Sequence, residues 1–217
     1  METNSTSSSQ KKAGFWSELF KVGPSRHEIW QQLCGEINAK YVAGGFWQED
    51  KIQLAYKTWT ITCDVYKVHA SKRVITYTRF RAPYVNSDGF RFHIYRAGFF
   101  SRLLVKLGMQ TVKIGNRKFD NEFIIQGSNQ AKCRDFFSST RLRALIASQP
   151  DIDFFVQDKE GLFSPPYPNN VYMLTFQVPY EMLDTAQLKT RFELFKEALE
   201  QLCKIGSAFD QEPRVTL

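Results

Sequence analysis

Basic and aromatic side chains gather in the middle third of this sequence, in a pattern suited to binding an anionic ligand. Residues 67–106 contain nine lysines and arginines but a single acid, Asp88. These forty residues carry a net charge of +8, whereas the whole chain of 217 residues carries +7. A regional excess of positive charge is typical of a surface that meets an anionic partner. The nine basic residues are Lys67, Lys72, Arg73, Arg79, Arg81, Arg91, Arg96, Arg102 and Lys106.

Six side chains of this region have the spacing of residues that share one face of a sheet. Side chains on a β-strand alternate between two faces, so residues two apart lie on the same side. The first three of the six belong to one predicted strand and the last three to the next, with a turn signal at Asn86–Gly89 between them. If the two strands pair across this turn, the six form one continuous surface. The candidate ligand-binding residues are Tyr77, Arg79, Arg81, Arg91, His93 and Tyr95.

The chemistry of this surface fits an anionic ligand. Guanidinium groups offer forked donors to phosphate and carboxylate, and tyrosine rings stack on nucleic acid bases. We therefore expect nucleic acid, a phosphorylated small molecule or an acidic protein as the partner. The competing interpretation is structural: the same residues form the solvated face of a half-buried sheet, or the arginines pair with some of the 21 other acids. The sequence leaves both interpretations open.

Catalytic and metal-binding patterns are scarce. The three histidines, His27, His69 and His93, do not stand at metal-ligand spacing from one another, from a cysteine or from an acid. The sequence also lacks glycine-rich phosphate loops and nucleophile motifs. Asp151 and Asp153 would share a face of a strand, where paired carboxylates can bind a cation or transfer protons. The apolar residues that follow favour a simpler interpretation, a polar start to a buried strand.

We therefore expect no catalytic residue, no metal and no cofactor. The alternative is an enzyme of unrecognised class, with a site assembled around His93 and neighbouring arginines. The four cysteines, Cys34, Cys63, Cys133 and Cys203, lie far apart within apolar patterns. In a chain without an export signal, this spacing predicts buried free thiols rather than disulfides or zinc ligands. Buried thiols are usually inert, which argues against a nucleophilic cysteine.

Two helices are marked by their capping residues. Ser25 and Glu28 form a capping-box pattern ahead of an apolar stripe, which predicts a helix to about Lys40. Asp184 predicts the start of a long terminal helix, with Gln187 at the capping-box position and Gly206 at its end. Apolar residues recur along this helix at spacings of four and three, as in a dimerising coiled coil. The stripe is wide, however, which fits a helix that covers a sheet better.

Between these helices the sequence predicts mostly strands. Several of them are joined by short turns, and this order predicts an α+β fold rather than alternating βαβ units. The expected architecture is an antiparallel sheet of hairpin-linked strands covered by helices, including the N-terminal capped helix and the long C-terminal helix. The predicted strands are 57–65, 73–82, 90–96, 111–114, 119–126, 151–157 and 171–179, and the predicted short helices are 99–107, 128–138 and 140–148.

The chain is expected to contain one domain. Residues 1–22 would form a disordered tail with a short aromatic amphipathic stretch at Gly14–Phe20, residues 23–210 a single α+β domain, and residues 211–217 a second tail. The N-terminus lacks the hydrophobic centre of a secretory signal, and no apolar run approaches the ~20 residues that span a bilayer. We therefore expect a cytoplasmic protein, monomeric or homodimeric. Peripheral membrane association through Gly14–Phe20 and the basic amphipathic stretch Phe99–Leu107 is an alternative.

Several phrases of the sequence occur together in a known group of proteins. They are YTRFRAPYVN at Tyr77–Asn86, GFRF at Gly89–Phe92, Phe119-Asp120 followed by Phe123–Ile125 and Gly127, and LRALI at Leu142–Ile146. In this combination the chain resembles an uncharacterised bacterial protein family, a domain of unknown function. The resemblance covers roughly Trp59 to the end of the terminal helix. It implies a bacterial origin and an α+β fold, but no activity, since none is established for the group.

A non-catalytic binding or scaffolding domain with a basic arginine and tyrosine surface is therefore the expected function. The partner would be an anionic ligand or an acidic protein, with nucleic acid among the candidates. An unrecognised enzyme and a peripheral membrane protein are the two alternatives.

Overall fold

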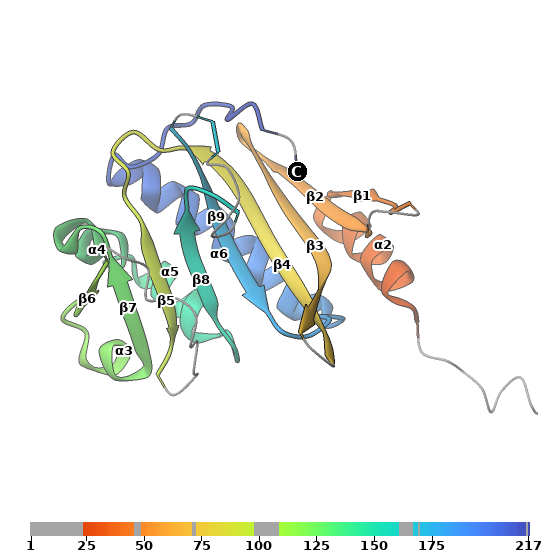
Figure 1. Cartoon of the computed structure of the whole chain (residues 1–217), viewed down its shortest axis with the longest axis horizontal. Helices are drawn as coiled ribbons and strands as arrows, with labels where there is room; N and C mark the ends of the chain where they lie inside the picture. Colours follow the sequence, from red (N-terminus) through yellow and green to blue (C-terminus); the bar gives the residue numbers. More distant parts are fainter. Residues whose placement is uncertain are drawn as a thin grey trace, which may run out of the picture.

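Within the part of the chain that the structure describes, nine strands form one antiparallel sheet (Figure 1). The structure is a computed structural model, and it describes residues 24–45, 49–70, 73–97, 109–160, 167–168, 170–215 and 217. The strands lie in the order β1-β2-β3-β4-β9-β8-β5-β7-β6. Their bounds are β1 Lys40–Val42, β2 Lys51–Tyr56, β3 Trp59–Ala70, β4 Arg73–Val85, β5 Phe92–Arg96, β6 Gln110–Val112, β7 Phe123–Gly127, β8 Asp153–Gln157 and β9 Val171–Val178.

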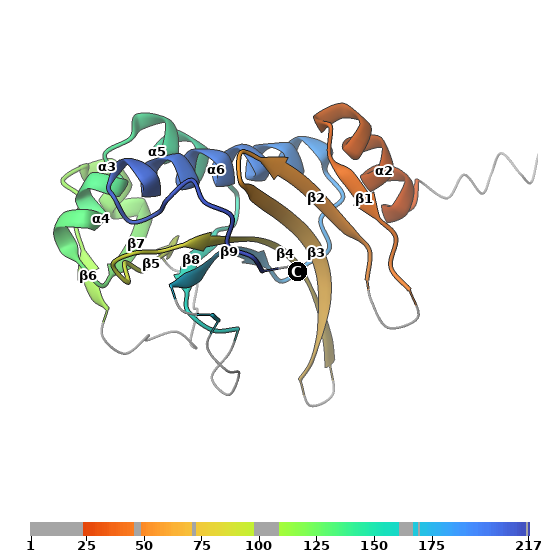
Figure 2. The same cartoon turned by 90° about the horizontal axis from the view of Figure 1, so that it is seen from above.

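The described helices lie on one side of this sheet, as Figure 2 shows for α2, α5 and α6. The helices are α2 Arg26–Ile37, α3 Arg117–Glu122, α4 Gln130–Phe136, α5 Thr140–Ala147 and α6 Thr185–Lys204. The longest, α6, packs on the centre of the sheet: the ring of Phe80 on β4 lies 5.1 Å from that of Phe192 and 5.9 Å from that of Phe195. The predicted α+β class is thus confirmed. None of the described helices is long and apolar enough to cross a bilayer.

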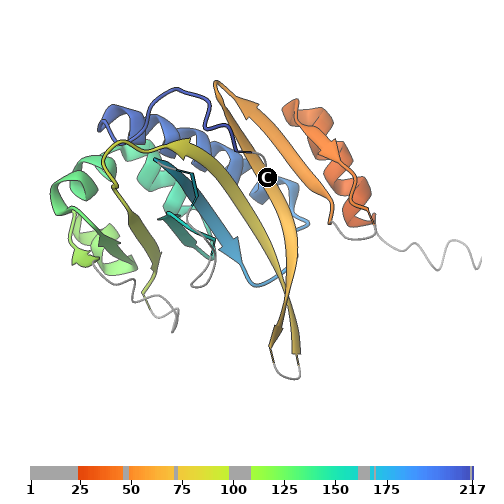
Figure 3. The same cartoon turned by 45° about the horizontal axis from the view of Figure 1, so that its top comes forward.

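The long β3–β4 hairpin extends beyond the other strands (Figure 3). β2 pairs with β3 only as far as Lys51 opposite Asp64, and β9 pairs with β4 only from Thr78 onward. We call the part beyond these pairs, Val65–Ala70 and Arg73–Tyr77, the hairpin arm. The predicted strands at 57–65 and 73–82 are therefore confirmed, but both are longer than expected. The hairpin arm continues outward from the strands that carry Asp64 and Arg79.

Several local predictions are confirmed by the hydrogen bonds at helix ends. The hydroxyl of Ser25 accepts from the amide of Glu28, whose carboxylate accepts from the amide of Ser25, so the capping box is present. The carboxylate of Asp184 accepts from the amides of Ala186 and Gln187 at the start of α6. Gly206 follows α6 with a φ of +70°, a left-handed conformation that ends many helices. The four cysteines are free, and all except the half-buried Cys203 are buried.

The strand pairing expected across Asn86–Gly89 is wrong. β4 and β5 do not pair, because β9 and β8 lie between them. β9 pairs with the last eight residues of β4, Thr78–Val85, and its Phe176 lies under α6 with Phe80 and Phe154. This aromatic contact and a long ladder outweigh the local preference for a tight hairpin. The turn at Asn86–Gly89 forms as predicted, but it sends the chain across the end of the sheet.

Two predicted boundaries are wrong for local reasons. Residues 119–126 do not form one strand, because α3 occupies them to Glu122 and β7 begins at Phe123. The side chain of Asn116 caps α3, and the carboxylate of Asp120 accepts from the amides of Ile114 and Gly115. The first helix ends at Ile37 rather than near Lys40, because Asn38 adopts a left-handed φ of 54°. The predicted amphipathic stretches 14–20 and 99–107 lie outside the described residues.

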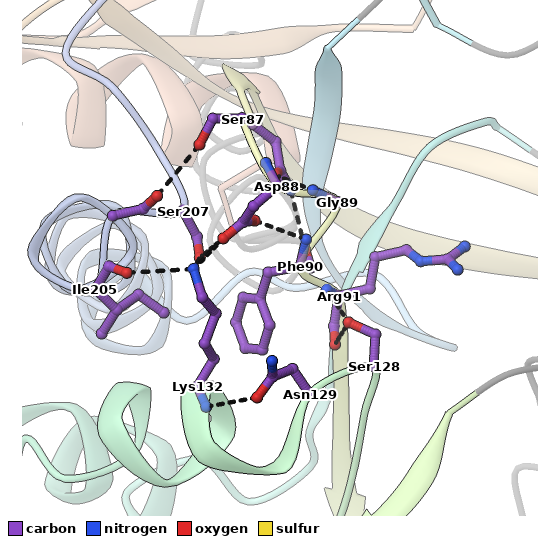
Figure 4. A network of polar contacts seen from close by, with 12 residues as sticks. Ser87, Asp88, Gly89, Phe90, Arg91, Ser128, Asn129, Lys132, Ile205 and Ser207 are labelled. Atoms are coloured by element: carbon purple, nitrogen blue, oxygen red, sulfur yellow. Dashed lines mark hydrogen bonds and ion pairs between the residues drawn. The ribbon is translucent and has the colours of Figure 1, made fainter.

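A network of polar contacts ties the Asn86–Gly89 turn to two helices (Figure 4). The carboxylate of Asp88 accepts hydrogen bonds from the Lys132 ammonium on α4, from the Ser207 hydroxyl after α6 at 2.9 Å, and from the Phe90 amide at 2.9 Å. We call Asp88, Lys132 and Ser207 the Asp88 clasp. Three distant parts of the sequence thus meet at one carboxylate.

One arginine of α6 is buried between this helix and the sheet. Arg191 is 0% exposed, and its guanidinium lies 4.9 Å from the centre of the Phe176 ring. Nη1 donates to the Gln187 carbonyl at 3.0 Å, but Nε and Nη2 have no acceptor in the part of the chain that the structure describes. Burial lowers the pKa of Arg191 below its ordinary value, as expected for a cation without a paired carboxylate.

Replacing this arginine by an apolar residue of similar length should stabilise the protein. Arg191→Met removes a buried charge that no carboxylate compensates, so the free energy of unfolding should rise by roughly 1–4 kcal/mol. Urea denaturation followed by tryptophan fluorescence measures it. Lys189→Met, which removes a cation from the same helix at a partly exposed position, should change it by less than about 0.5 kcal/mol. A destabilised Arg191→Met variant would contradict the prediction.

The Asp88 clasp should stabilise the fold in a pH-dependent way. Burial alone would raise the pKa of Asp88, but the bonds from Lys132, Phe90 and Ser207 lower it below its ordinary value. The contribution of such a group is present above its unfolded pKa of about 3.9 and is lost as the pH falls through the folded value. Asp88→Asn should therefore lower the free energy of unfolding by about 1–2 kcal/mol at neutral pH.

The same difference should shrink as the pH falls below about 3.9 and through the folded pKa, because the native carboxylate then becomes protonated as well. Urea denaturation at several pH values tests this. Asp135→Asn, an exposed position on the same helix as Lys132, is the matched control and should have little effect at any pH. A deficit of Asp88→Asn that stays constant down to acid pH would show that the charge of Asp88 is not responsible.

Candidate functional site

The face of the sheet away from α6 is polar, and register determines which residues it contains. Directly opposed residues of an antiparallel ladder share a face. Phe80 is opposite Phe176, which is opposite Phe154, and this row packs under α6. The neighbouring residues on each strand therefore point the other way. We call this second side the open face, because no described helix covers it (Figure 2).

All six candidate residues lie on the open face, but in two groups. Arg81 is opposite Thr175, Thr175 is opposite Phe155, and Phe155 is opposite His93, so both groups point to the same side. Two strands, β9 and β8, separate them. The structure therefore places the six on one face without joining them into the continuous surface expected from a β4–β5 hairpin. The first group is Tyr77, Arg79 and Arg81, and the second is Arg91, His93 and Tyr95.

The first group is built around a buried acid on the neighbouring strand. Asp64, 5% exposed as a side chain, accepts from Arg79 Nε at 3.0 Å and Nη2 at 3.1 Å, and also from Arg81 Nη2. The second acid, Glu160, follows β8, and its Oε1 accepts from Nη1 of both arginines at 2.9 Å. We call Asp64, Arg79, Arg81 and Glu160 the arginine cluster.

The two acids of the arginine cluster differ in exposure. Asp64 is buried between the strands, whereas the side chain of Glu160 is 47% exposed. Burial alone would lower the pKa of Arg79, but the hydrogen bond and charge of Asp64 and the charge of Glu160 raise it. The guanidinium of Arg79 is therefore held as a cation. Asp64 is the buried counter-ion of both arginines, and Glu160 contacts them from the solvent side.

A cavity of about 320 Å³ lies beside the arginine cluster where β2, β3 and β4 meet. Its charged lining consists of four cations, Lys51, Lys67, Arg79 and Arg81, and two acids, Glu49 and Asp64. Lys67 pairs with Glu49 at 3.3 Å. Lys51 makes no ion pair with the described residues. The cavity is at the lower end of the size range of small-ligand sites, and its lining has an excess of positive charge.

A chain of hydrogen bonds runs across the open face from the cavity to the second group. Tyr66, which lines the cavity, donates from its hydroxyl to Gln177 Oε1 at 2.9 Å. Gln177 Nε2 donates to Asp153 Oδ2 at 2.8 Å. The other oxygen of Asp153 lies 2.6 Å from His93 Nε2. The guanidinium of Arg79 also lies 4.5 Å from the centre of the Tyr66 ring, so the arginine cluster and this polar chain are in contact.

In the second group, His93 is enclosed, whereas Arg91 is more exposed than the two arginines of the first group. Arg91 Nη1 donates to Asp158 at 3.2 Å, and the rings of His93 and Tyr95 lie 4.9 Å apart. His93 is 0% exposed, and its Nδ1 is buried without a hydrogen-bond partner. A histidine that acts on a substrate must contact it, and His93 is not among the residues that line the cavity. The His93–Asp153 pair thus lies outside the cavity beside the arginine cluster.

Other reactive groups are also enclosed. Burial raises the pKa of the Cys133 thiol to about 12 and that of Cys63 well above its ordinary value. Such thiols stay protonated at neutral pH and react slowly. Asp151 and Asp153 have separate partners, since Asp151 accepts from the Tyr180 hydroxyl at 3.2 Å. Among the described residues, no three histidines, cysteines or acids are grouped so that they could hold a metal ion.

Sequence reasoning missed the acids of the arginine cluster. The alternation of apolar and polar residues puts Asp64 on the polar side of its strand. Its role, however, depends on the β3–β4 register, in which it is opposite Arg79. The pairing of Ala70 with Arg73 belongs to the same register, and both strands were predicted, so the pair was within reach of the sequence. Glu160 could not be found in this way, because it lies about 80 residues after the two arginines. It reaches the cluster only because β9 and β8 are inserted next to β4. Gln177 was missed for the same reason, and Lys51 was missed because no strand was predicted at residues 51–56.

Comparison with protein-family models, with curated proteins and with solved structures finds no match to this chain, which is consistent with the resemblance to an uncharacterised group. The geometry of the open face is therefore the only guide to function.

Removing the buried acid of the arginine cluster should strongly destabilise the fold. Asp64→Asn leaves two adjacent guanidinium groups with only the exposed Glu160, so the free energy of unfolding should fall by about 3 kcal/mol. Asp158→Asn removes an acid from the more exposed pair with Arg91 and should cost less than about 1 kcal/mol. Chemical denaturation of the three proteins measures both values. Equal losses for the two variants would show that Asp64 is not the central counter-ion.

Proposed function

We propose that this protein is a binding domain that holds an anionic group in the cavity beside the arginine cluster. One observation carries the proposal. Nη1 of Arg79 and Nη1 of Arg81 converge on a single oxygen of an exposed carboxylate, at 2.9 Å each. Two guanidinium groups that share one oxygen form a strong oxyanion site, and Glu160 demonstrates in the folded chain that a carboxylate fits it.

The surroundings of the cluster support a ligand site rather than a purely structural ion-pair network. A network that only stabilises the fold needs no adjoining cavity, yet one of about 320 Å³ is present. Lys51 extends into its lining without an ion pair to any described residue, so positive charge is left over after the internal pairs are counted. Buried Arg81 also retains a donor, Nε, that has no acceptor among the described residues. Hydrogen-bond donors without a partner beside a cavity are typical of a ligand-binding site.

Anion binding should depend on this cavity and not on the general basicity of the chain. Phosphate, citrate and a short single-stranded oligonucleotide are suitable probes in isothermal titration calorimetry at low and high salt. Arg79→Gln should weaken binding of the best probe by about ten-fold, because a hydrogen bond to a charged group contributes roughly 1.5 kcal/mol. Lys51→Gln should weaken it by a few-fold and leaves every described ion pair intact.

Arg91→Gln is the matched control, because it removes an arginine from the same face but outside the cavity. It should leave the affinity unchanged. Thermal melts of each variant show whether a loss of binding reflects unfolding. The proposal fails if none of the three probes binds, or if Arg91→Gln weakens binding as much as Lys51→Gln does.

A further inference from the structure

The charge count of the arginine cluster indicates which kind of anion it takes. Asp64 neutralises one of the two guanidinium groups, which leaves a single positive charge for the group at the Glu160 position. One carboxylate matches this charge, whereas a phosphate dianion would leave an excess negative charge in a half-buried site. The position occupied by Glu160 is therefore matched to a side chain or chain-terminal carboxylate.

Glu160 has the properties of a group that can be displaced. Its side chain is exposed, while its two partners are 17% and 7% exposed. Exposed ion pairs contribute little to stability, and Asp64 stays in place as the buried counter-ion. An incoming carboxylate could therefore replace Glu160 at the guanidinium groups without changing the charge of the cluster. Lys51, unpaired among the described residues, is available for a second acidic group of the same ligand.

Apolar side chains continue from this site along the hairpin arm. Tyr66 is opposite Tyr77, with ring centres 5.1 Å apart, and Val68 is opposite Ile75. These four residues are on the open face, since they continue the alternation that places Asp64 and Arg79 there. Val68 is 39% exposed. We call the four residues the arm stripe.

One edge of the hairpin arm also has backbone amide and carbonyl groups that are available for pairing with another strand. No described strand pairs with the outer side of Arg73–Tyr77, because the β4–β9 ladder begins at Thr78. Exposed strand edges are used by proteins that add an extended peptide to a sheet. The arm therefore combines an open edge, an apolar stripe and an adjacent carboxylate site, and it projects from the body of the molecule (Figures 2 and 3).

We infer that the ligand of this site is an extended acidic peptide segment of a partner protein. One carboxylate of the segment replaces Glu160 between Arg79 and Arg81, and neighbouring apolar side chains lie on the arm stripe. Glu160 acts as an internal competitor that occupies the site in the free protein. This inference rests on the proposed function, and it names the class of ligand that the cavity takes.

Removal of the internal competitor tests the inference. The probe is a fluorescein-labelled peptide whose glutamate and phenylalanine residues stand two positions apart, with serine between them, so that both types share one face of the extended chain. Its binding to the full chain is followed by fluorescence polarisation. Glu160→Gln should bind it at least five-fold more tightly than the unmodified protein. Asp158→Asn is the matched control, because it removes one negative charge two residues away and should have little effect. Val68→Ser should weaken binding, and a peptide with glutamine in place of glutamate should not bind.

Each contrary result has a distinct meaning. Equal gains for Glu160→Gln and Asp158→Asn would show a general charge effect and overturn the role of Glu160. If the peptide fails to bind both proteins while phosphate or the oligonucleotide binds in an Arg79-dependent way, the peptide inference is wrong and the proposed anion site stands. If no probe binds any variant, both proposals are wrong.

Discussion

The register between β4 and β9 determines which side chains of this protein meet α6 and which form the open face. With Phe80 opposite Phe176, aromatic rings fill the interface with the helix, and Arg79 and Arg81 point to the other side together with Gln177 and Thr175. A shift by one residue would exchange the two faces and place guanidinium groups under α6. Burial of the aromatic side chains therefore specifies the position of the charged ones. The candidate site is, in this sense, a by-product of core packing.

Asp64 and Arg191 illustrate two ways in which this fold treats buried charge. Asp64 is enclosed by two arginines, so its charge is compensated within the sheet. Arg191 lies between α6 and the sheet with a carbonyl, an amide oxygen and an aromatic ring as neighbours, and no carboxylate of the described residues pairs with it. The open face thus concentrates the compensated charges beside a cavity, while the uncompensated one is enclosed by the core. Only the first arrangement offers its charges to a ligand.

Local patterns in the sequence were sufficient for most elements and for the fold class. Ser25, Asp184 and Gly206 mark the ends of helices through hydrogen bonds and backbone conformations that depend on a few adjacent residues. The alternation along β3 and β4 likewise identified the arginines of the open face. Phe119 was misassigned because a short helix capped by Asn116 carries the same apolar residues as a strand. Pairing of distant strands has no local signature, so the insertion of β9 and β8 between β4 and β5, and the contact of Glu160 with the arginines, could not be derived.

The insertion of β9 between β4 and β8 has a consequence for the order in which the chain can fold during synthesis. β2, β3 and β4 can pair as they leave the ribosome, but the edge of β4 at Thr78–Val85 finds its partner only when residues 171–178 have emerged. Nearly ninety residues lie between the end of β4 at Val85 and the start of β9 at Val171, and all of them are synthesised first. Until then the edge of β4 is unpaired, and an unpaired strand edge is prone to associate with other chains. Arg79 and Arg81 lie on that edge, and charged side chains are a common protection of waiting strands. The two residues that hold Glu160 in the finished protein thus also place positive charge on the strand edge that β9 later covers.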